Sequence, residues 1–171
     1  MALFIQHAKT HIPTFAGIKW AASDLAGLLR CKALHGDSIA LMWANDDVLL
    51  GALAVGIRSF NGTTYSFSTK TARSIVDAYK RGDTAGAARE QLYLKTVVDL
   101  LEEDGNWLQR HKAILEFLTG IPTGPARLPL PPLTDAAIKK LTLDYTKLYR
   151  ISRQKKLDTL IRCGLVRSRS I

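Results

Sequence analysis

The sequence contains no apolar run long enough to cross a lipid bilayer, which takes about 20 consecutive apolar residues. Hydrophobic residues make up 47% of the 171 positions, and polar and charged residues interrupt them throughout. The first residues, M-A-L-F-I-Q-H-A-K-T-H, lack the basic region and the long apolar region of a signal peptide. We therefore expect no membrane partner, a cytoplasmic location and one globular domain with a sizeable core.

Cysteine is also scarce, since the chain has only Cys31 and Cys163. These two residues do not have the spacing of a zinc site. Without a secretory signal they are more typical of free thiols than of a disulfide. We expect neither a metal site nor a bound cofactor.

Acidic residues are fewer than basic ones, with 15 Asp and Glu against 24 Lys and Arg and a net charge of +9. Eight basic residues and one acidic residue lie within residues 147–171, a net charge of +7, which leaves +2 for residues 1–146. A basic tail can bind phosphate groups, but this one lacks an interleaved aromatic pattern and any recognisable nucleic-acid motif. We expect residues 150–171 to be a solvated basic tail. A nucleic-acid binder that uses this tail is the least favoured alternative.

Short apolar runs alternate with helical patterns in the first part of the chain. We predict strands over residues 15–20, 38–43 and 57–60, and helices over residues 2–9, 24–33 and 48–55. This alternation is typical of parallel strands joined by right-handed crossovers. The predicted fold class is therefore α/β, with residues 1–67 as its strand–helix units.

The pattern is only helical after residue 67. We predict helices over residues 71–81, 84–103, 107–118 and 134–149, and a weaker one over residues 152–163. Five of the six prolines lie in residues 120–133, so this segment can be neither a helix nor a central strand. Residues 68–149 therefore form a helical appendage to the strand–helix units.

Polar side chains follow each predicted strand. Lys19 lies near the end of the first strand between two apolar residues, Asp46 and Asp47 follow the second strand, and Thr63 follows the third. Functional groups gather beyond the carboxyl ends of parallel strands, so these residues form a candidate site. The lysine is either a strand-end residue whose head reaches water or a desolvated amine that forms a Schiff base. The aspartates have a second interpretation as helix caps, and the threonine as a turn residue.

Five motifs resemble those of the N-acetylneuraminate lyases, which belong to the lysine-dependent (β/α)8 aldolases that include dihydrodipicolinate synthase. They are I-P-T-F-x-G-I-K, D-D-x-L-L-x-A-L-x-x-G, G-T-T-Y, Y-K-R-G-D-x-x-x-A and G-I-P-x-G-P-x-R-x-P, in this order within residues 5–134. The resemblance implies the C-terminal part of a TIM barrel, strands six to eight, followed by a helical region.

The resemblance also implies roles for the candidate residues. Lys19 would form the Schiff base with a 2-oxo acid, Asp46 and Asp47 would bind sugar hydroxyls, and Thr63 would help to hold the sugar chain. The implied reaction is aldol cleavage of the sialic acid N-acetylneuraminate to pyruvate and N-acetylmannosamine, in sialic acid catabolism. The family enzyme would work without a cofactor as a homo-oligomer, a homotetramer.

The chain departs from this pattern in three respects. A complete barrel needs about 250 residues, and strands one to five have no counterpart, including a loop for the pyruvate carboxylate and a proton-relaying tyrosine. Ala21 replaces a usual Thr or Ser, and Ala44 replaces a Gly that lets the substrate approach the backbone. We therefore expect the isolated chain to be weakly active or inactive. The alternative is a non-catalytic half-barrel that associates with full-length lyase subunits.

Overall fold

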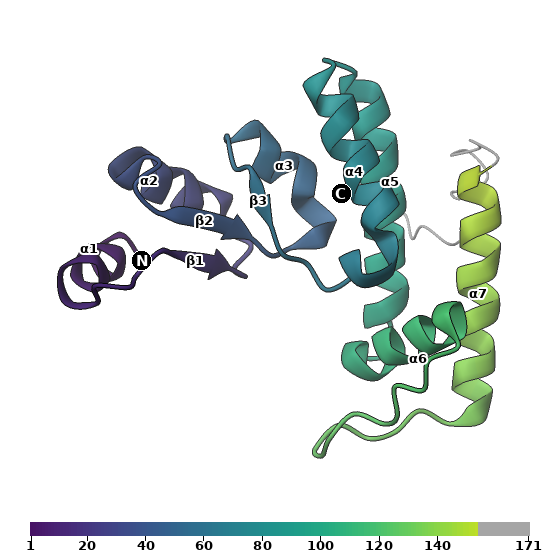
Figure 1. The fold of residues 1–171 in the computed structure, drawn as a ribbon. Helices are drawn as coiled ribbons and strands as arrows, with labels where there is room; N and C mark the ends of the chain where they lie inside the picture. The colour runs from purple at the N-terminus through teal and green to yellow at the C-terminus, as the bar shows by residue number, and fades with distance from the viewer. Residues whose placement is uncertain (154–171) are drawn as a thin grey trace.

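The fold is built on a small parallel sheet. The structure, a computed structural model, describes residues 1–153. Strands β1 (Gly17–Trp20), β2 (Ala40–Trp43) and β3 (Ser59–Phe60) form the sheet in the order β1-β2-β3 (Figure 1). Lys19 pairs with Met42, and Met42 pairs with Ser59, so these three residues lie side by side across the sheet. The predicted α/β class with parallel strands is confirmed.

The first core lies between the sheet and the early helices. These are α1 (Ala2–His11), α2 (Leu25–His35) and α3 (Leu49–Ala54), with a short 3-10 helix, η1 (Asp46–Val48), before α3. The buried residues of this core are Ile5, Trp20, Leu28, Cys31, Ile39, Leu41, Trp43, Ala52 and Ile57. Alternate strand positions supply Trp20, Leu41 and Trp43, as expected of strands that bury one face against helices.

The opposite face of the sheet is open in the part of the chain that the structure describes. Lys19 and Ala40 point to this side and are exposed, whereas their strand neighbours Trp20 and Leu41 are buried. Within residues 1–153, β1 pairs only with β2, so its outer edge has no partner strand. Lys19 therefore lies on a sheet face that helices do not cover.

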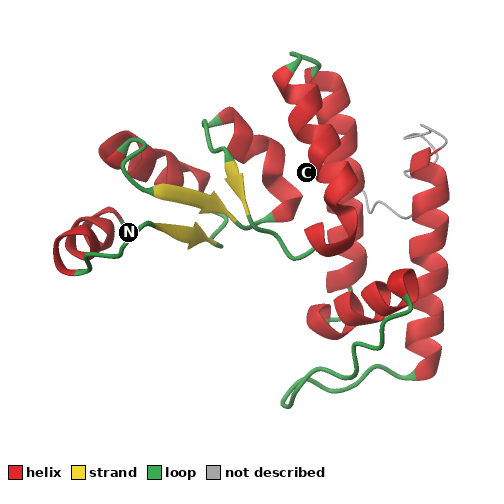
Figure 2. Cartoon of the chain, viewed as in Figure 1, coloured by secondary structure: helices red, strands yellow, loops and turns green. Residues whose placement is uncertain are grey.

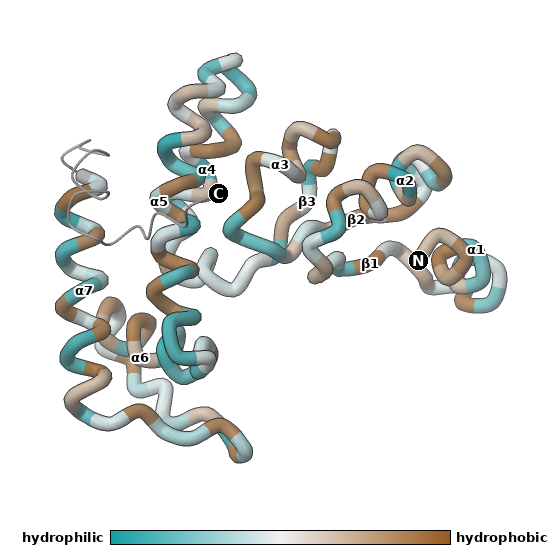
Figure 3. The backbone as a smooth tube through the Cα atoms, turned by 180° about the vertical axis from the view of Figure 1, so that it is seen from behind, coloured by the Kyte–Doolittle hydropathy of each residue, from teal (hydrophilic) through white to brown (hydrophobic). Residues whose placement is uncertain are grey.

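The rest of the described chain contains helices and loops but no strand (Figure 2). They are α4 (Tyr65–Lys80), α5 (Thr84–Glu102), α6 (Trp107–Thr119) and α7 (Asp135–Arg153). Hydrophobic and hydrophilic residues alternate along α7 (Figure 3), which packs one face against α5 and α6. Leu49 and Leu53 of α3 pack with Ile75 of α4 and Leu94 of α5, so the helical region shares a core with the strand–helix units.

The ends of two helices differ from the prediction by more than two residues. Helix α4 begins at Tyr65, before the predicted residue 71, and contains a non-helical residue, Ser68, with φ −105° and ψ 19°. It therefore crosses residue 67, and a domain boundary at that point stays a prediction. Helix α7 continues to Arg153 rather than ending at residue 149. The rest of the basic tail, with Cys163 and most of the helix predicted over residues 152–163, lies outside the described residues.

The proline-rich segment behaves as predicted. Residues 120–133 contain neither helix nor strand. Gly120 ends α6 in the left-handed region, with φ 70°, and its N–H donates to the carbonyl oxygen of Glu116 at 2.7 Å. The segment then leads to α7, whose first turn Thr134 caps by accepting from the N–H of Ala137 at 3.2 Å.

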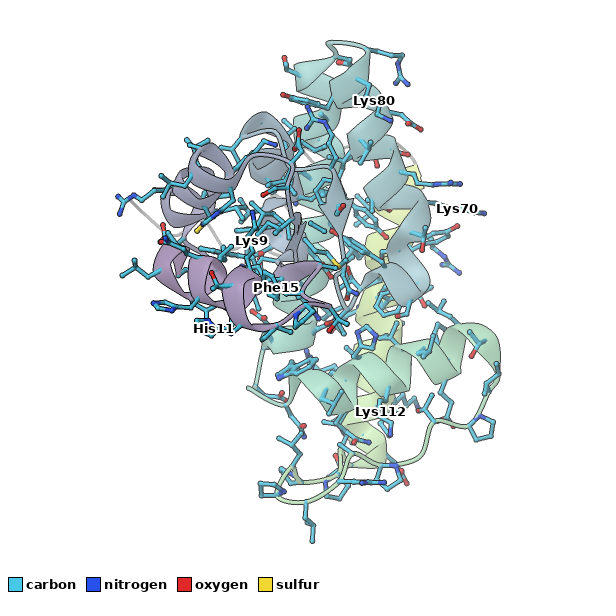
Figure 4. All side chains as sticks on the ribbon, turned by 60° about the vertical axis from the view of Figure 1, so that its left-hand side comes forward. Lys9, His11, Phe15, Lys70, Lys80 and Lys112 are labelled. Atoms are coloured by element: carbon cyan, nitrogen blue, oxygen red, sulfur yellow. The ribbon has the colours of Figure 1, made fainter. Side chains whose placement is uncertain are left out.

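The four lysines labelled in Figure 4 lie on helices α1, α4 and α6. Lys9 lies on α1, Lys70 and Lys80 on α4, and Lys112 on α6. The Nζ atoms of Lys9 and Lys112 donate within the chain, to the Ser38 hydroxyl at 2.8 Å and the Pro125 carbonyl at 3.0 Å.

Candidate active site

The loops that follow the strands meet at one edge of the sheet. The N–H of Ala44 donates to the carbonyl of Trp20 at 2.9 Å, and the N–H of Asn61 donates to the carbonyl of Trp43 at 2.9 Å. Strand pairing thus continues past the ends of the strands. It holds together the segments that carry the predicted site residues.

Asp46 joins the loop after β2 to the start of α4. Its side chain is buried, and its Oδ2 atom accepts from the Thr64 N–H at 2.7 Å and the Thr64 hydroxyl at 2.6 Å. Burial raises the pKa of the Asp46 carboxyl, while the two bonds from Thr64 favour its charged form and limit the rise. Burial, and then the nearby Asp46 charge, also raise the pKa of the Tyr65 phenol.

Helix capping by the aspartates takes a different form from the one predicted. Neither η1 nor α3 receives a hydrogen bond from the side chain of its own N-cap residue, Asn45 and Val48 respectively. Asp46 instead accepts from a backbone N–H at the start of another helix, α4. The carboxylate is therefore a connection between two strand–helix units.

A pocket of about 220 Å³ opens beside this connection, between the loops after β2 and β3 and the helices α5 and α6. Asp46, Asp47 and Thr63 all line it, so three of the four predicted site residues come together. The other lining residues are Ala44, Asn45, Thr64, Val98, Leu101, Glu102, Trp107 and His111. The lining contains carboxylates and hydroxyls but no lysine or arginine, so it offers hydrogen-bond acceptors beside an apolar wall.

Lys19 does not line this pocket. Its side chain is exposed on the open face of the sheet, at the end of β1. Within the described residues, the Lys19 side chain therefore faces solvent, and its role as a Schiff-base lysine stays a prediction. The Lys19 amine on the open face of the sheet and the hydrogen-bond acceptors in the pocket are two separate parts of the candidate site.

Sequence reasoning missed the wall that α5 and α6 contribute. Trp107 and His111 lie one turn apart on α6, and Leu101 and Glu102 are near the end of α5. A spacing of four residues identifies one helix face. It does not say which loops that face meets, because the contacts are more than 30 residues away in the chain.

His111 is a buried, neutral group in this wall. It is 6% exposed, and its Nε2 atom lies 2.9 Å from the Ser66 hydroxyl oxygen. Its ring lies 4.9 Å from that of Phe67, between centroids. Burial lowers the pKa of His111 from its ordinary value of 6.5, because the charged imidazolium loses its hydration.

We expect His111 to make folding sensitive to mild acid. The unfolded chain binds a proton at His111 at a higher pH than the folded chain does, since burial lowers the folded pKa from 6.5. The stabilising difference is complete above pH 6.5 and decreases as the pH falls toward the folded pKa. Urea unfolding at about pH 7.5 and about pH 5.5 measures this loss. His111→Phe should reduce the loss of unfolding free energy between the two pH values, and His7→Gln, at an exposed position, should not. An equal loss in all three proteins would contradict the expectation.

Two further classes of feature are absent from residues 1–153. No helix there combines the length and apolarity that a membrane span requires. No group of three or more His, Cys, Asp or Glu side chains in the same residues is arranged to hold a metal ion.

The sequence matches a known protein family over most of its length. A model of the dihydrodipicolinate synthetase family matches residues 4–147. The chain belongs to this family. Among curated members, it is 31% identical to the N-acetylneuraminate lyase of Mus musculus over 152 residues, covering 85% of this chain and 48% of the mouse protein. It is 31% identical to the Homo sapiens N-acetylneuraminate lyase over 140 residues, covering 78% and 44%.

Solved structures of the dihydrodipicolinate synthetase family give the same picture. The fold superimposes on Proteus mirabilis N-acetylneuraminate lyase with a TM-score of 0.81 at 26% identity, covering 86% of this chain and 50% of that one. The Aliivibrio salmonicida lyase gives 0.81 at 28% identity, covering 86% and 49%. The chain thus spans about half the length of the relatives it matches, and its three strands correspond to part of a TIM-barrel lyase.

Proposed function

We propose that this chain carries part of the active site of a Schiff-base aldolase of the N-acetylneuraminate lyase type. The observation that carries the proposal is that the three parallel strands end at the same edge of the sheet. Lys19 lies near this edge on β1, and Asp46, Asp47 and Thr63 lie in the loops after β2 and β3. The similarity to N-acetylneuraminate lyases over 85% of the chain supports it. Sialic acid and pyruvate are the proposed ligands.

The proposed chemistry begins at the Lys19 amine. The neutral amine attacks the ketone carbon of a 2-oxo acid, a proton from solvent lets the former ketone oxygen leave as water, and a protonated imine remains. A base then removes the proton from the hydroxyl group two carbons away. The carbon–carbon bond breaks, its electron pair moves into the imine to form an enamine, and an aldehyde leaves. Protonation of the enamine and hydrolysis release pyruvate and the free lysine.

The proposed sugar subsite is the pocket beside Asp47. Asp47 is half-buried and Thr63 is exposed, so both can offer oxygen atoms to hydroxyl groups. Trp107 adds an apolar surface against which a sugar ring can pack. A lining without lysine or arginine favours an uncharged, hydroxyl-rich aldehyde such as N-acetylmannosamine.

Borohydride trapping tests the role of Lys19. The full chain is incubated with pyruvate, reduced with borohydride, digested and analysed by peptide mass. We expect the reduced adduct on Lys19, none at this position in Lys19→Met, and an unchanged adduct in Lys9→Met. An absent adduct on Lys19, or equal labelling of the exposed Lys70 and Lys80, would remove the Schiff-base role from this chain.

The open sheet face favours a second candidate, a half-barrel that associates with lyase subunits. The unpaired edge of β1 and the exposed Ala40 lie where a longer barrel would continue. Size-exclusion chromatography with a full-length lyase tests this candidate, and a stable monomer in the mixture argues against it. In either case we propose a cytoplasmic protein that works within an oligomer.

A further inference from the structure

Gln91 on α5 joins two backbone groups of the loop and helix that follow β2. Its side-chain Nε2 donates to the carbonyl of Asp46 at 3.0 Å, and its Oε1 accepts from the N–H of Leu50 at 2.7 Å. The glutamine is 45 and 41 residues away from these partners in the chain. One half-buried amide therefore uses both its donor and its acceptor on the same segment.

The Leu50 N–H has no side-chain cap from its own segment. Leu50 lies in the first turn of α3, where backbone N–H groups lack acceptors within the helix. Val48, the N-cap residue of α3, provides no side-chain hydrogen bond, and neither does Asn45 before η1. Gln91 supplies from a neighbouring helix the acceptor that an N-cap side chain usually supplies.

The helix that carries Gln91 also contributes to the wall of the pocket. Val98, Leu101 and Glu102 lie further along α5 and line the pocket together with Asp47. The bonds of Gln91 therefore connect the loop that carries Asp47 to a helix that lines the same pocket. Asp46 connects the same loop to the start of α4 through its two hydrogen bonds with Thr64.

We infer that Gln91 is a positioning residue, which holds the Asp46–Asp47 corner at a fixed distance from α5 so that the pocket fits a hydroxyl-rich ligand. Only the identity of the ligand rests on the proposed function. The connection between α5 and the loop after β2 rests on the two hydrogen bonds of Gln91. Gln91 does not line the pocket, so it acts through Asp47 rather than on the ligand.

Two substitutions separate the two bonds. Gln91→Met keeps the length of the side chain and removes both the donor and the acceptor. Gln91→Glu keeps an acceptor for the Leu50 N–H and removes the donor to the Asp46 carbonyl. Arg89→Gln, at an exposed position on the same helix, is the matched control.

Hydrogen exchange of the full chain, measured by NMR, tests the hydrogen bonds of Gln91 without any ligand. In Gln91→Met we expect the Leu50 amide to exchange about tenfold faster than in the unaltered chain, while the amides in the middle of α5 keep their rates. Gln91→Glu should restore the Leu50 rate, and Arg89→Gln should leave it unchanged. An unchanged Leu50 rate in Gln91→Met would overturn the inference.

Titration with N-acetylmannosamine measures how the Gln91 substitutions change the affinity of the pocket for a sugar. We expect Gln91→Met to weaken binding about tenfold, because Asp47 is no longer held, with the global unfolding midpoint close to that of Arg89→Gln. Unchanged affinity in a variant with a faster Leu50 amide would overturn the positioning role. If the unaltered chain does not bind the sugar, the proposed ligand fails. Resonance shifts of the Asp46 and Asp47 amides in Gln91→Met then decide the positioning role, and unchanged resonances would overturn it.

Discussion

Gly62→Ala is expected to destabilise the folded chain by roughly 3 kcal/mol or more. A Cβ atom at residue 62 would overlap the carboxylate of Asp46. This carboxylate cannot simply rotate away, because Thr64 holds it through its backbone N–H and its hydroxyl. Alanine therefore forces a buried carboxyl group off two hydrogen bonds. Urea or thermal unfolding of the two proteins measures the loss.

A double-mutant cycle shows whether the loss comes from this overlap. Asp46→Ala removes the carboxylate and its bonds to Thr64, and is destabilising by itself. In that background Gly62→Ala has no carboxylate to displace, so its further cost should be small. Equal costs of Gly62→Ala in the two backgrounds would mean that another feature of the loop requires glycine.

The strands and most helices could be predicted from local patterns. The run before Asn45 is apolar enough to indicate a strand, and helical spacing with a break at Gly105 gives α5 and α6 nearly to the residue. The start of α4 could not be predicted, because the turn at Thr63 and Thr64 does not by itself indicate that a helix begins directly after it. The helix begins there because Asp46, far away in the chain, accepts from Thr64.

The candidate site could be predicted only in part, for a similar reason. Asp46, Asp47 and Thr63 follow strands, and the rule for the ends of parallel strands brings them together. Gln91 and His111 reach the same region from helices more than 40 residues from their partners, and nothing in their own neighbourhood indicates it. The exposure of Lys19 depends on which strands lie beside β1, and a pattern within β1 does not contain that information.

Addition of the missing part of a barrel should activate Lys19. We expect the segment of the mouse N-acetylneuraminate lyase that this chain does not match to bind the open sheet face when the two are mixed or coexpressed. Cleavage of N-acetylneuraminate should then rise about 10²-fold or more above that of the chain alone. The cause is that a second segment would remove water from the lysine and bring the acid–base and carboxylate-binding groups that the family resemblance implies. Release of pyruvate is the measurement.

Two variants separate this effect from residual activity of the added segment. Lys19→Met in the mixture should abolish the increase while the complex still forms. Ala40→Arg places a large charged side chain on the exposed face, where the chain alone tolerates it, so it should prevent association without unfolding the chain. An increase that survives either substitution would assign the activity to the added segment. Association of Lys19→Met without turnover, beside turnover in the unaltered mixture, would assign the nucleophile to this chain and the remaining catalytic groups to its partner.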